Sequence, residues 1–143
     1  MSKTLPVHFR IKSISTNQFA ILDKSKLNQN LKIELKVILN IDVEEKIISV
    51  NLSFNFTYRS KKIMILEVSN DFEIKKEDWP KLMKDSVIHI DKNLALHLAM
   101  ITVGTARGIL HCRTSMMDLQ PYVLPSINLF EIIKEDVEIP LNI

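Results

Sequence analysis

Four histidines and a single cysteine are the residues of this chain whose types could support catalysis or bind a metal. His97, His111 and Cys112 fall in one apolar stretch that predicts a helix, and about four helical turns separate the two histidines. His111 and Cys112 are adjacent, so they point to different faces and do not form a thiol–imidazole pair. The chain has no HxxxH, CxxC or HExxH spacing. We therefore expect no metal site, no cofactor and no enzymatic activity, and we interpret Cys112 as a packed core residue.

Two further patterns resemble functional sites only superficially. The segment Gly104–Gly108 has glycines at both ends, but it lies in the middle of the predicted helix and lacks the Lys-Ser/Thr ending of a phosphate-binding loop. We interpret its small residues as a close helix contact, across which Arg107 pairs with a carboxylate. The acidic residues Glu67, Asp71 and Glu73 share the polar face of a predicted strand, where a solvated surface is favoured over an acid–base pair.

The elements that would position these residues begin with strands. Apolar and polar residues alternate along Leu31–Ile41, Ile48–Tyr58 and Met64–Ile74, which is typical of strands with one buried face. The connections between these three runs are short and polar, so they should pair as an antiparallel meander. An earlier strand is predicted across Val7–Ser13, extending toward Ile21. The polar loop Lys24–Asn30 would then carry the chain across to the far side of the sheet.

The second half of the chain predicts helices that cover this sheet. Pro80 suits the first turn of a short helix over Trp79–Lys84, and Asp91 is a candidate N-cap for a long helix over Lys92–Met116. The long helix is apolar on several sides, more than one sheet can bury, so it predicts a subunit interface. A second helix-like segment follows at Leu129–Lys134. One face of the long helix is expected to contain Leu94, Leu98, Ile101, Thr105, Gly108 and Cys112.

Length, charge and cysteine content limit the class of protein. With 143 residues the chain fits one domain, 1–143, that buries a core without disulfides. The net charge of +2 and the interspersed lysines and glutamates argue against nucleic acid as a partner. The single cysteine suits a reducing compartment, and Met1–Lys12 has no apolar signal segment. The apolar stretch Leu94–Leu110 contains His97 and Arg107, which favours a buried helix over a membrane span. We therefore expect a cytoplasmic protein.

Three stretches together resemble the SecB-type protein-export chaperones. Met64–Val68 followed by Phe72–Ile74 is similar to that family's strand with a Phe-Leu-Cys-Glu-Val core, and Thr105–Gly108 resembles its Tyr-Ala-Arg helix. Leu124–Leu129 resembles the Phe-Pro-x-Leu-Asn-Leu segment that follows the same helix, and Phe9–Ile11 is similar to the family's first strand. Order and spacing agree over nearly the whole chain, and the order of the motifs is the specific part of the resemblance.

The resemblance implies an α+β fold in which a four-stranded antiparallel sheet carries the long helix and a short C-terminal helix on one face. It also implies a homotetramer, built as a dimer of dimers through the long helices and sheet edges. We expect the oligomer contact on the helix at Gly104, Arg107, Gly108 and Cys112. The resemblance further implies hydrophobic grooves that bind unfolded chains, with client contacts expected at Phe54, Phe56, Met64, Tyr122, Val123 and Leu124.

The family docks its translocase motor ATPase on an acidic outer sheet face. Glu67 matches one of those acids and Ile65 an adjacent apolar contact, but two acids of the family's first strand align with Gln18 and Leu22. The sequence therefore predicts an ATP-independent holdase for unfolded polypeptides or preproteins, with the motor ATPase as a further partner. The alternative is a dedicated partner-binding module, such as a SecB-like chaperone of a toxin–antitoxin system. A small-ligand or enzymatic role would require an enclosed pocket near Arg107 or His97.

Overall fold

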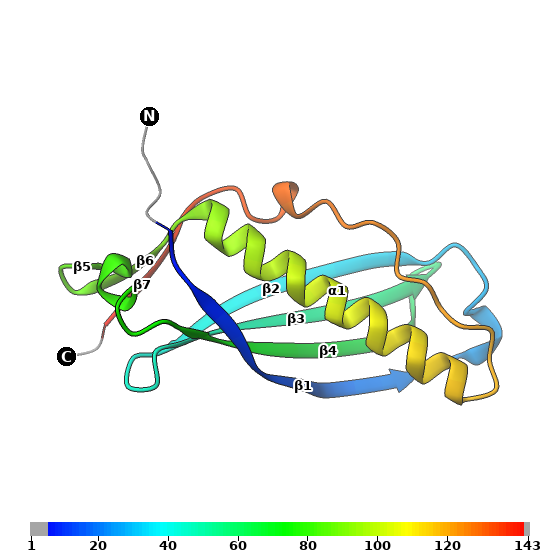
Figure 1. Ribbon diagram of the computed structural model, residues 1–143. Helices are drawn as coiled ribbons and strands as arrows, with labels where there is room; N and C mark the ends of the chain where they lie inside the picture. Colours follow the sequence, from blue (N-terminus) through cyan, green and yellow to red (C-terminus); the bar gives the residue numbers. More distant parts are fainter. Residues whose placement is uncertain (1–5, 142–143) are drawn as a thin grey trace.

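The computed structural model describes residues 6–141, which form an α+β protein with one long helix laid along a four-stranded antiparallel sheet (Figure 1). The strands are β1 (Phe9–Ile21), β2 (Lys32–Asp42), β3 (Ile47–Tyr58) and β4 (Lys61–Ile74), in the spatial order β1-β4-β3-β2. The predicted fold class is confirmed, and so is the antiparallel meander of β2, β3 and β4. Positions 1–5, which belong to the N-terminal segment in which we expect no apolar signal segment, lie outside the described residues. Positions 142 and 143 also lie outside them.

Alternation along the strands produces one dry and one polar face. Leu52 lies opposite Val68 and Phe54 opposite Leu66 across β3 and β4, and all four side chains are buried. Because successive residues of a strand point to opposite faces, the intervening residues are polar neighbours on the other side. There the Asn51 amide donates to the Ser69 hydroxyl at 2.8 Å, and it is one of several such contacts on that face.

The hairpin between β3 and β4 departs from simple alternation. Its turn places Arg59 and Ser60 at φ values of 50° and 65°, as in the two-residue turns whose twist matches antiparallel strands. Neither residue is glycine or asparagine, so the sequence carries no signal for this turn. The register also shifts here, and Ile63, expected on the polar face, is fully buried. Its carbonyl accepts from the Leu22 and Asp23 amides at 2.8 and 3.2 Å, which ties the outgoing chain of β1 to the hairpin.

The long helix α1 (Lys92–Met116) has the predicted bounds and the predicted cap. The Asp91 carboxylate accepts from the Asn93 amide at 2.9 Å, satisfying one of the free N–H groups of the first turn. Of the six residues predicted to share one face of this helix, only Leu98 is fully buried. The buried stripe is displaced around the helix, since neighbouring stripes are also apolar and periodicity does not choose between them. It consists of Ala95, Leu96, Leu98, Ala99, Thr102, Val103, Ala106, Leu110 and Thr114.

By length and composition α1 also meets the criteria of a membrane-spanning helix, which the core helix of a soluble protein can meet as well. Here it lies along the dry face of the sheet, over β3 and β4 (Figure 1). Nine of its residues are buried, which supports the interpretation as a core helix.

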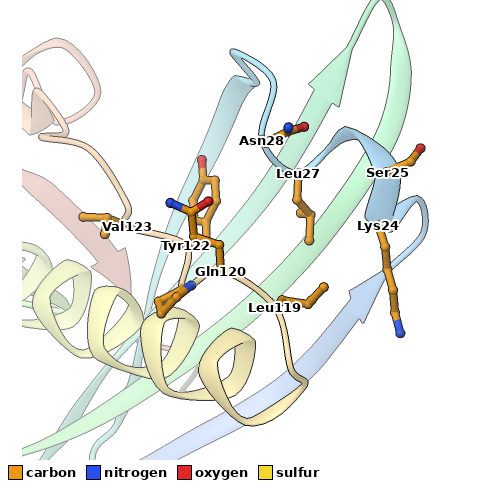
Figure 2. Close-up of a pocket in the computed structure, with 9 residues that line it drawn as sticks. Lys24, Ser25, Leu27, Asn28, Leu119, Gln120, Tyr122 and Val123 are labelled. Carbon is orange, nitrogen blue, oxygen red and sulfur yellow. The ribbon is translucent and has the colours of Figure 1, made fainter.

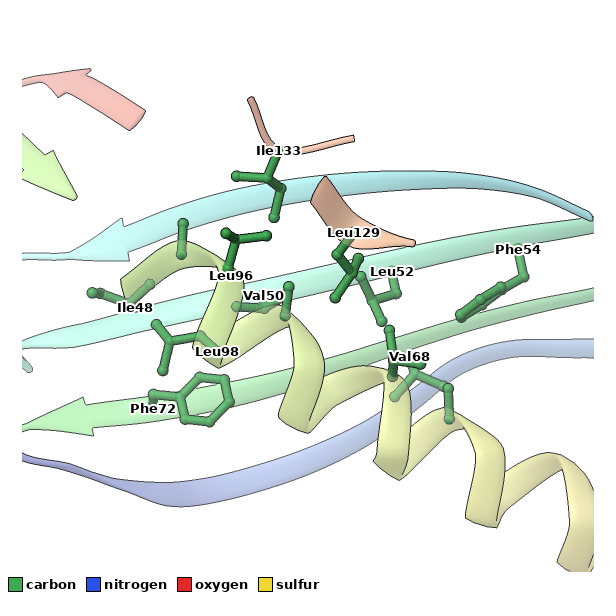
Figure 3. Close-up of a cluster of buried hydrophobic side chains, with 14 of the residues drawn as sticks. Ile48, Val50, Leu52, Phe54, Val68, Phe72, Leu96, Leu98, Leu129 and Ile133 are labelled. Atoms are coloured by element: carbon green, nitrogen blue, oxygen red, sulfur yellow. The ribbon is translucent and has the colours of Figure 1, made fainter. Parts of the chain in front are cut away.

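The core fills the space between α1 and the dry face of β3 and β4 (Figure 3). Phe72 and Leu98 pack there with no exposed surface, and Val50 and Leu52 continue the layer along β3. The predicted C-terminal helix is a single 3₁₀ turn, η3 (Leu129–Glu131). It nevertheless takes the expected place: Leu129 and Ile133 are buried and close the core on the side of β2 (Figure 3).

A second, smaller sheet lies beyond the N-terminal end of α1 and is not predicted by the sequence. The predicted helix over Trp79–Lys84 is a 3₁₀ turn, η2 (Trp79–Leu82), that runs into β5 (Met83–Lys84). β5 pairs with β6 (Val87–Ile90), which pairs with the C-terminal β7 (Val137–Pro140). The pairing of β6 with β7 joins segments on either side of α1, so it closes this end of the molecule.

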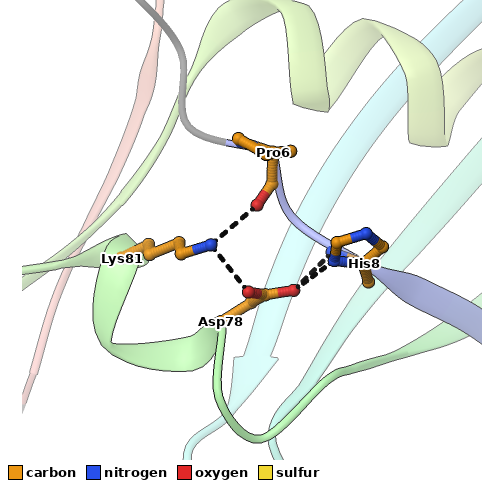
Figure 4. A network of polar contacts seen from close by, with 4 residues as sticks. All are labelled: Pro6, His8, Asp78 and Lys81. Atoms are coloured by element: carbon orange, nitrogen blue, oxygen red, sulfur yellow. Dashed lines mark hydrogen bonds and ion pairs between the residues drawn. The ribbon is translucent and has the colours of Figure 1, made fainter.

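A buried carboxylate joins the start of β1 to η2 (Figure 4). Asp78 accepts from the backbone amide of His8 and contacts the His8 ring, both at 2.8 Å, and it accepts from Lys81 Nζ at 2.8 Å. Lys81 also donates to the Pro6 carbonyl at 3.1 Å. The Lys81 hydrogen bond, followed by those from His8, holds the pKa of Asp78 far below its usual range.

Candidate polypeptide-binding groove

A hollow of about 540 Å³ opens between the chain that crosses the sheet and the chain that follows α1 (Figure 2). We call residues 22–31 the crossover, residues 117–128 the connection, and the hollow between them the connection groove. The crossover contains the 3₁₀ turn η1 (Lys24–Lys26), which Asp23 caps by accepting from the Ser25 amide at 3.1 Å. The volume lies within the range of about 300–1,000 Å³ that is usual for ligand pockets. The groove is lined by Lys24, Ser25, Leu27, Asn28, Leu119, Gln120, Pro121, Tyr122 and Val123.

The connection is held against the helix by two side chains of α1. The buried Thr114 hydroxyl donates to the Leu110 carbonyl at 2.7 Å and accepts from the Tyr122 amide at 2.8 Å. About two turns toward the N-terminus, Arg107 donates to the carbonyls of Leu124 and Pro125 at 3.0 and 3.1 Å. These contacts satisfy backbone groups of a segment with no secondary structure of its own. The groove wall is therefore preformed.

Tyr122 lines the groove and packs on the sheet. Its ring packs edge-on against Phe56 of β3, with centroids 5.4 Å apart and an interplanar angle of 82°. The ring is half-buried, and this burial raises the pKa of the phenol. The ordinary pKa of about 10 already keeps a tyrosine hydroxyl neutral at physiological pH. An aromatic body with a neutral polar tip suits contact with both the side chains and the backbone of a bound chain.

A second hollow, also of about 540 Å³, lies between the last turns of α1 and the end of β1. We call it the helix-end hollow. The Arg113 guanidinium carbon lies 5.4 Å from the centre of the Phe19 ring, and Cys112 Sγ lies 3.8 Å from Met116 Sδ. Flexible, polarisable side chains of this kind adapt to apolar partners of different shapes. The hollow is lined by Phe19, Ala20, Ile21, Cys112, Arg113, Met116 and Met117.

The residues predicted for client contact divide into two groups. Phe54, Phe56, Met64 and Leu124 are core residues of the protomer, each with no more than 1% of its surface exposed. Strand alternation puts Phe54, Phe56 and Met64 on the dry face, which α1 and the connection cover, and Leu124 of the connection is itself buried in the core. Tyr122 and Val123 do line the connection groove, and Val123 is 65% exposed. The structure thus brings the last two together with the crossover, which sequence reasoning did not assign to the site.

A weak sequence signal for the missing wall exists in hindsight. Leu27 and Leu119 are isolated apolar residues in otherwise polar, irregular segments, and neither fits a strand or helix period. Nothing in the sequence indicates that they meet, because they are far apart in the chain. Only the crossing of the sheet after β1 and the return of the chain after α1 bring them to the same place (Figure 2).

The residues expected at an oligomer interface lie on the outer side of α1. Gly104, Gly108 and Cys112 are exposed in the protomer, so the interpretation of Cys112 as a packed core residue is wrong for the protomer. A Cβ added at either glycine would meet no atom within 4 Å, so packing inside the protomer does not require glycine at these positions. Arg107 is oriented instead toward the connection, where its guanidinium binds two carbonyl groups. This placement differs from the expected pairing with a carboxylate.

The residues matched to motor-ATPase docking lie on the polar face of the sheet. Ile65 and Glu67 are half-buried in β4, and Glu67 Oε1 accepts from the Asn51 amide at 3.1 Å. In β1, Gln18 lies opposite Glu67. Further along the same face Glu73 pairs with Arg10 at 2.7 Å and with Lys12 at 3.8 Å. These cations balance part of the negative charge of the face.

The histidines are dispersed. The His97 ring packs against Phe9 with centroids 5.5 Å apart, and His111 is exposed. His89 lies between two carboxylates of the C-terminal segment, 3.0 Å from Asp136 and 3.2 Å from Glu138, an arrangement that joins β6 to β7 and that the sequence did not indicate. In residues 6–141, no group of three or more histidine, cysteine, aspartate or glutamate side chains is arranged to hold a metal ion.

Comparison with known proteins bears on the fold. No family model matches the chain, and no curated protein matches it. A solved SecB-like chaperone from Mycobacterium tuberculosis, in complex with a peptide from the HigA1 antitoxin, matches with a TM-score of 0.53 at 16% identity, covering 84% of this chain and 91% of that chain. A protein of unknown function from Streptococcus agalactiae matches with a TM-score of 0.42 at 13% identity, covering 85% of this chain and 100% of that chain. The first match confirms the SecB-like fold.

Proposed function

We propose that this protein is a non-enzymatic, ATP-independent chaperone that holds unfolded polypeptides, and that the connection groove binds an extended segment of the client. The observation that carries the proposal is a preformed hollow of about 540 Å³, walled by Tyr122, Val123 and the crossover, on a SecB-like fold. Its walls combine apolar side chains with backbone and amide groups, which matches the mixed chemistry of an unfolded chain. The helix-end hollow offers a second apolar surface on the other side of α1.

The physical basis of holding is apolar surface that the protomer leaves uncovered. Each square ångström of apolar surface that a client removes from water contributes about 25 cal/mol. Exposed methionine and valine side chains make such contacts with little demand on sequence. Because burial itself drives binding, no nucleotide is needed to capture a client.

The test is suppression of aggregation of a chemically denatured protein. Val123→Asp places a charge in the groove wall, and we expect binding about tenfold weaker, since burial of a valine side chain is worth about 1.5 kcal/mol. The matched control is Phe130→Asp: Phe130 is 63% exposed, close to the 65% of Val123, but does not line the groove. Equal loss in both variants would place holding elsewhere, and absence of suppression by the unmodified protein would contradict the proposal.

A dedicated partner-binding role is the second candidate function. It is favoured by one observation: the solved SecB-like chaperone from Mycobacterium tuberculosis holds a peptide of an antitoxin. A protein of this fold can therefore hold a peptide of one specific partner. Quantitative capture from the native cell extract distinguishes the two roles. One dominant partner and no binding to unrelated unfolded proteins would favour the dedicated role, including service to a toxin–antitoxin pair.

We also propose that the protein works as a homotetramer. The exposed stripe of Gly104, Gly108 and Cys112 offers a surface on which a second α1 approaches closely, because glycine has no side chain to separate the two backbones. Arg107 would support that contact indirectly, by fixing the connection beside it. Size-exclusion chromatography with light scattering tests this, and a monomer at micromolar concentration would remove the basis for the proposal.

Export remains a finer proposal within the same function. The motor ATPase would dock at Ile65 and Glu67 on the polar sheet face, in the cytoplasm. The presence of Gln18 opposite Glu67, where the resemblance expects acids, makes this contact weaker in charge than in the SecB family. Titration of the purified ATPase against the protein and a Glu67→Gln variant is the measurement. Absence of binding by the unmodified protein would limit the role to holding.

A further inference from the structure

Cations gather around the connection groove, where the crossover meets the β3–β4 hairpin. Lys24 lines the groove. In the same turn, Lys26 Nζ lies 5.7 Å from the centre of the Tyr58 ring, and the Arg59 guanidinium carbon lies 5.1 Å from it. Cation–π contacts hold these two side chains in place but leave their charge intact. The crossover and the hairpin beside the groove, which we call the rim, therefore carry positive charge, and the Tyr58 ring orients two of the three cations.

The nearest carboxylate does not neutralise this rim. Asp23 accepts from the Ser25 hydroxyl at 2.6 Å and from Lys61 Nζ at 3.3 Å. The Ser25 hydroxyl first, and Lys61 after it, lower the pKa of Asp23, so its charge is present and is matched by that of Lys61. The charges of Asp23 and Lys61 offset each other, so the remaining lysine and arginine side chains determine the net charge of this region.

Those cations have no acidic partner of their own in residues 6–141: Lys24, Lys26 and Arg59 form no ion pair there. Asp118 lies in the connection directly before Leu119, but it does not line the groove. The lining thus contains one lysine and no carboxylate, beside the apolar side chains of Leu27, Leu119 and Tyr122 and the amides of Asn28 and Gln120.

We infer that the connection groove selects extended polypeptide segments in which apolar residues are flanked by aspartate or glutamate. This inference rests on the proposed function and names the client chemistry of the same site. The apolar side chains of the segment would enter between Leu27 and Tyr122, while its carboxylates face Lys24 and Lys26. Charge complementarity of this kind steers encounter and rejects clients with basic flanks, even where it adds little to affinity.

Three fluorescent peptides of equal length test the inference, with the same apolar centre and flanks of aspartate, asparagine or lysine. Binding is measured by fluorescence anisotropy at low and at physiological ionic strength. We expect the aspartate-flanked peptide to bind about tenfold more tightly than the lysine-flanked one, as a few exposed ion pairs provide. Salt should reduce this ratio, because exposed charges are screened.

Charge reversal at the rim provides the decisive variants. Lys24→Glu with Lys26→Glu should invert the order of the peptides, and Lys24→Gln with Lys26→Gln should bring their affinities together. The matched control is Lys76→Glu with Lys134→Glu, which makes the same change in net charge at exposed positions outside the groove. The control should keep the original order, which excludes an effect of net charge alone.

The outcomes distinguish failure of the inference from failure of the proposed function. Equal or tighter binding of the lysine-flanked peptide, or an unchanged order in the Lys24/Lys26 reversal, would overturn the inference but leave the proposed function in place. Equally tight binding of an acidic peptide without apolar residues, or of a short oligouridylate, would also overturn it, by showing nonspecific attraction of polyanions. Failure of all three peptides to bind would overturn the proposed function, and the inference with it.

Discussion

The two ends of α1 are covered to different degrees, although they belong to one helix on one sheet. Six of its buried residues lie between Ala95 and Val103, and three lie between Ala106 and Thr114. We call the first region, with the small sheet and η3, the closed end, and the second, with the two hollows, the open end. The closed end is sealed by Leu129, Ile133 and the pairing of β6 with β7. Beside the open end lie the connection and the end of β1, with a hollow at each.

This difference separates stability from binding within one small protein. The buried side chains at the closed end are closely packed, so they contribute to the free energy of folding. Side chains at the open end, among them Met116 at 79% exposure, contribute little to folding and remain free to contact a client. Four changes would sharpen or break this comparison, in order of decreasing expected effect on stability.

The largest effect should come from Leu98→Ala at the closed end. Leu98 is fully buried, so the change leaves a cavity, and we expect a loss of about 2–5 kcal/mol in the free energy of unfolding. Urea denaturation measures it. Peptide binding per folded molecule should be unchanged under native conditions. A loss below about 1 kcal/mol would mean that this end is not the tightly packed part of the molecule.

Thr114→Val, at the boundary of the two regions, should have an intermediate effect. The change keeps the shape of the side chain but removes the hydroxyl that accepts from the Tyr122 amide. We expect a loss of about 1–2 kcal/mol, because a buried amide is left without its partner. Hydrogen exchange at that amide should accelerate, and peptide binding should weaken as the groove wall loosens. Unchanged exchange would show that Arg107 alone holds the connection.

Asp78→Asn tests the polar seal of the closed end through its pH dependence. The pKa of Asp78 is lowered in the folded protein, so the charged carboxylate stabilises the fold above its unfolded pKa of about 3.9. This stabilisation is lost as the pH falls through the folded pKa. The variant should therefore be less stable near neutral pH and converge with the unmodified protein in acid. Thermal melts across this range measure it, and Asp85→Asn at an exposed turn should show no such dependence.

The smallest effect on stability is expected for Met116→Ser at the open end. Met116 makes few contacts in the protomer, so the free energy of unfolding should change by less than about 0.5 kcal/mol. Binding of apolar peptides should weaken if the helix-end hollow takes part in holding. A large loss of stability would break the comparison, because it would mean that Met116 is buried in the native assembly.

Much of the fold is readable from local patterns. The alternation along Leu31–Ile41, Ile48–Tyr58 and Met64–Ile74 predicts the strands because side-chain direction repeats every two residues. Asp91 predicts the start of α1 because a carboxylate at that position satisfies free N–H groups of the first turn. The β3–β4 turn at Arg59 and Ser60 has no such signal, since its residues adopt positive φ without glycine or asparagine.

The candidate site was less predictable than the fold. Tyr122 and Val123 were assigned by resemblance and do line the groove, whereas Phe54, Phe56 and Met64 are core residues. Alternation shows that those three share the dry face, but it does not show how much of that face the helix covers. Coverage depends on where α1 lies across the sheet, and that is settled by contacts between residues far apart in the chain.

The sequence by itself determined the elements: four strands with one dry face, the bounds and cap of α1, and the class of fold. These depend on interactions within a few residues or on the period of apolar positions. Only the tertiary structure decided which stripe of α1 is buried, that β6 pairs with β7, and that the crossover and the connection enclose a groove lined by one lysine and no carboxylate. The physical reason is that burial and charge balance are properties of neighbours in space, which periodicity along the chain does not identify.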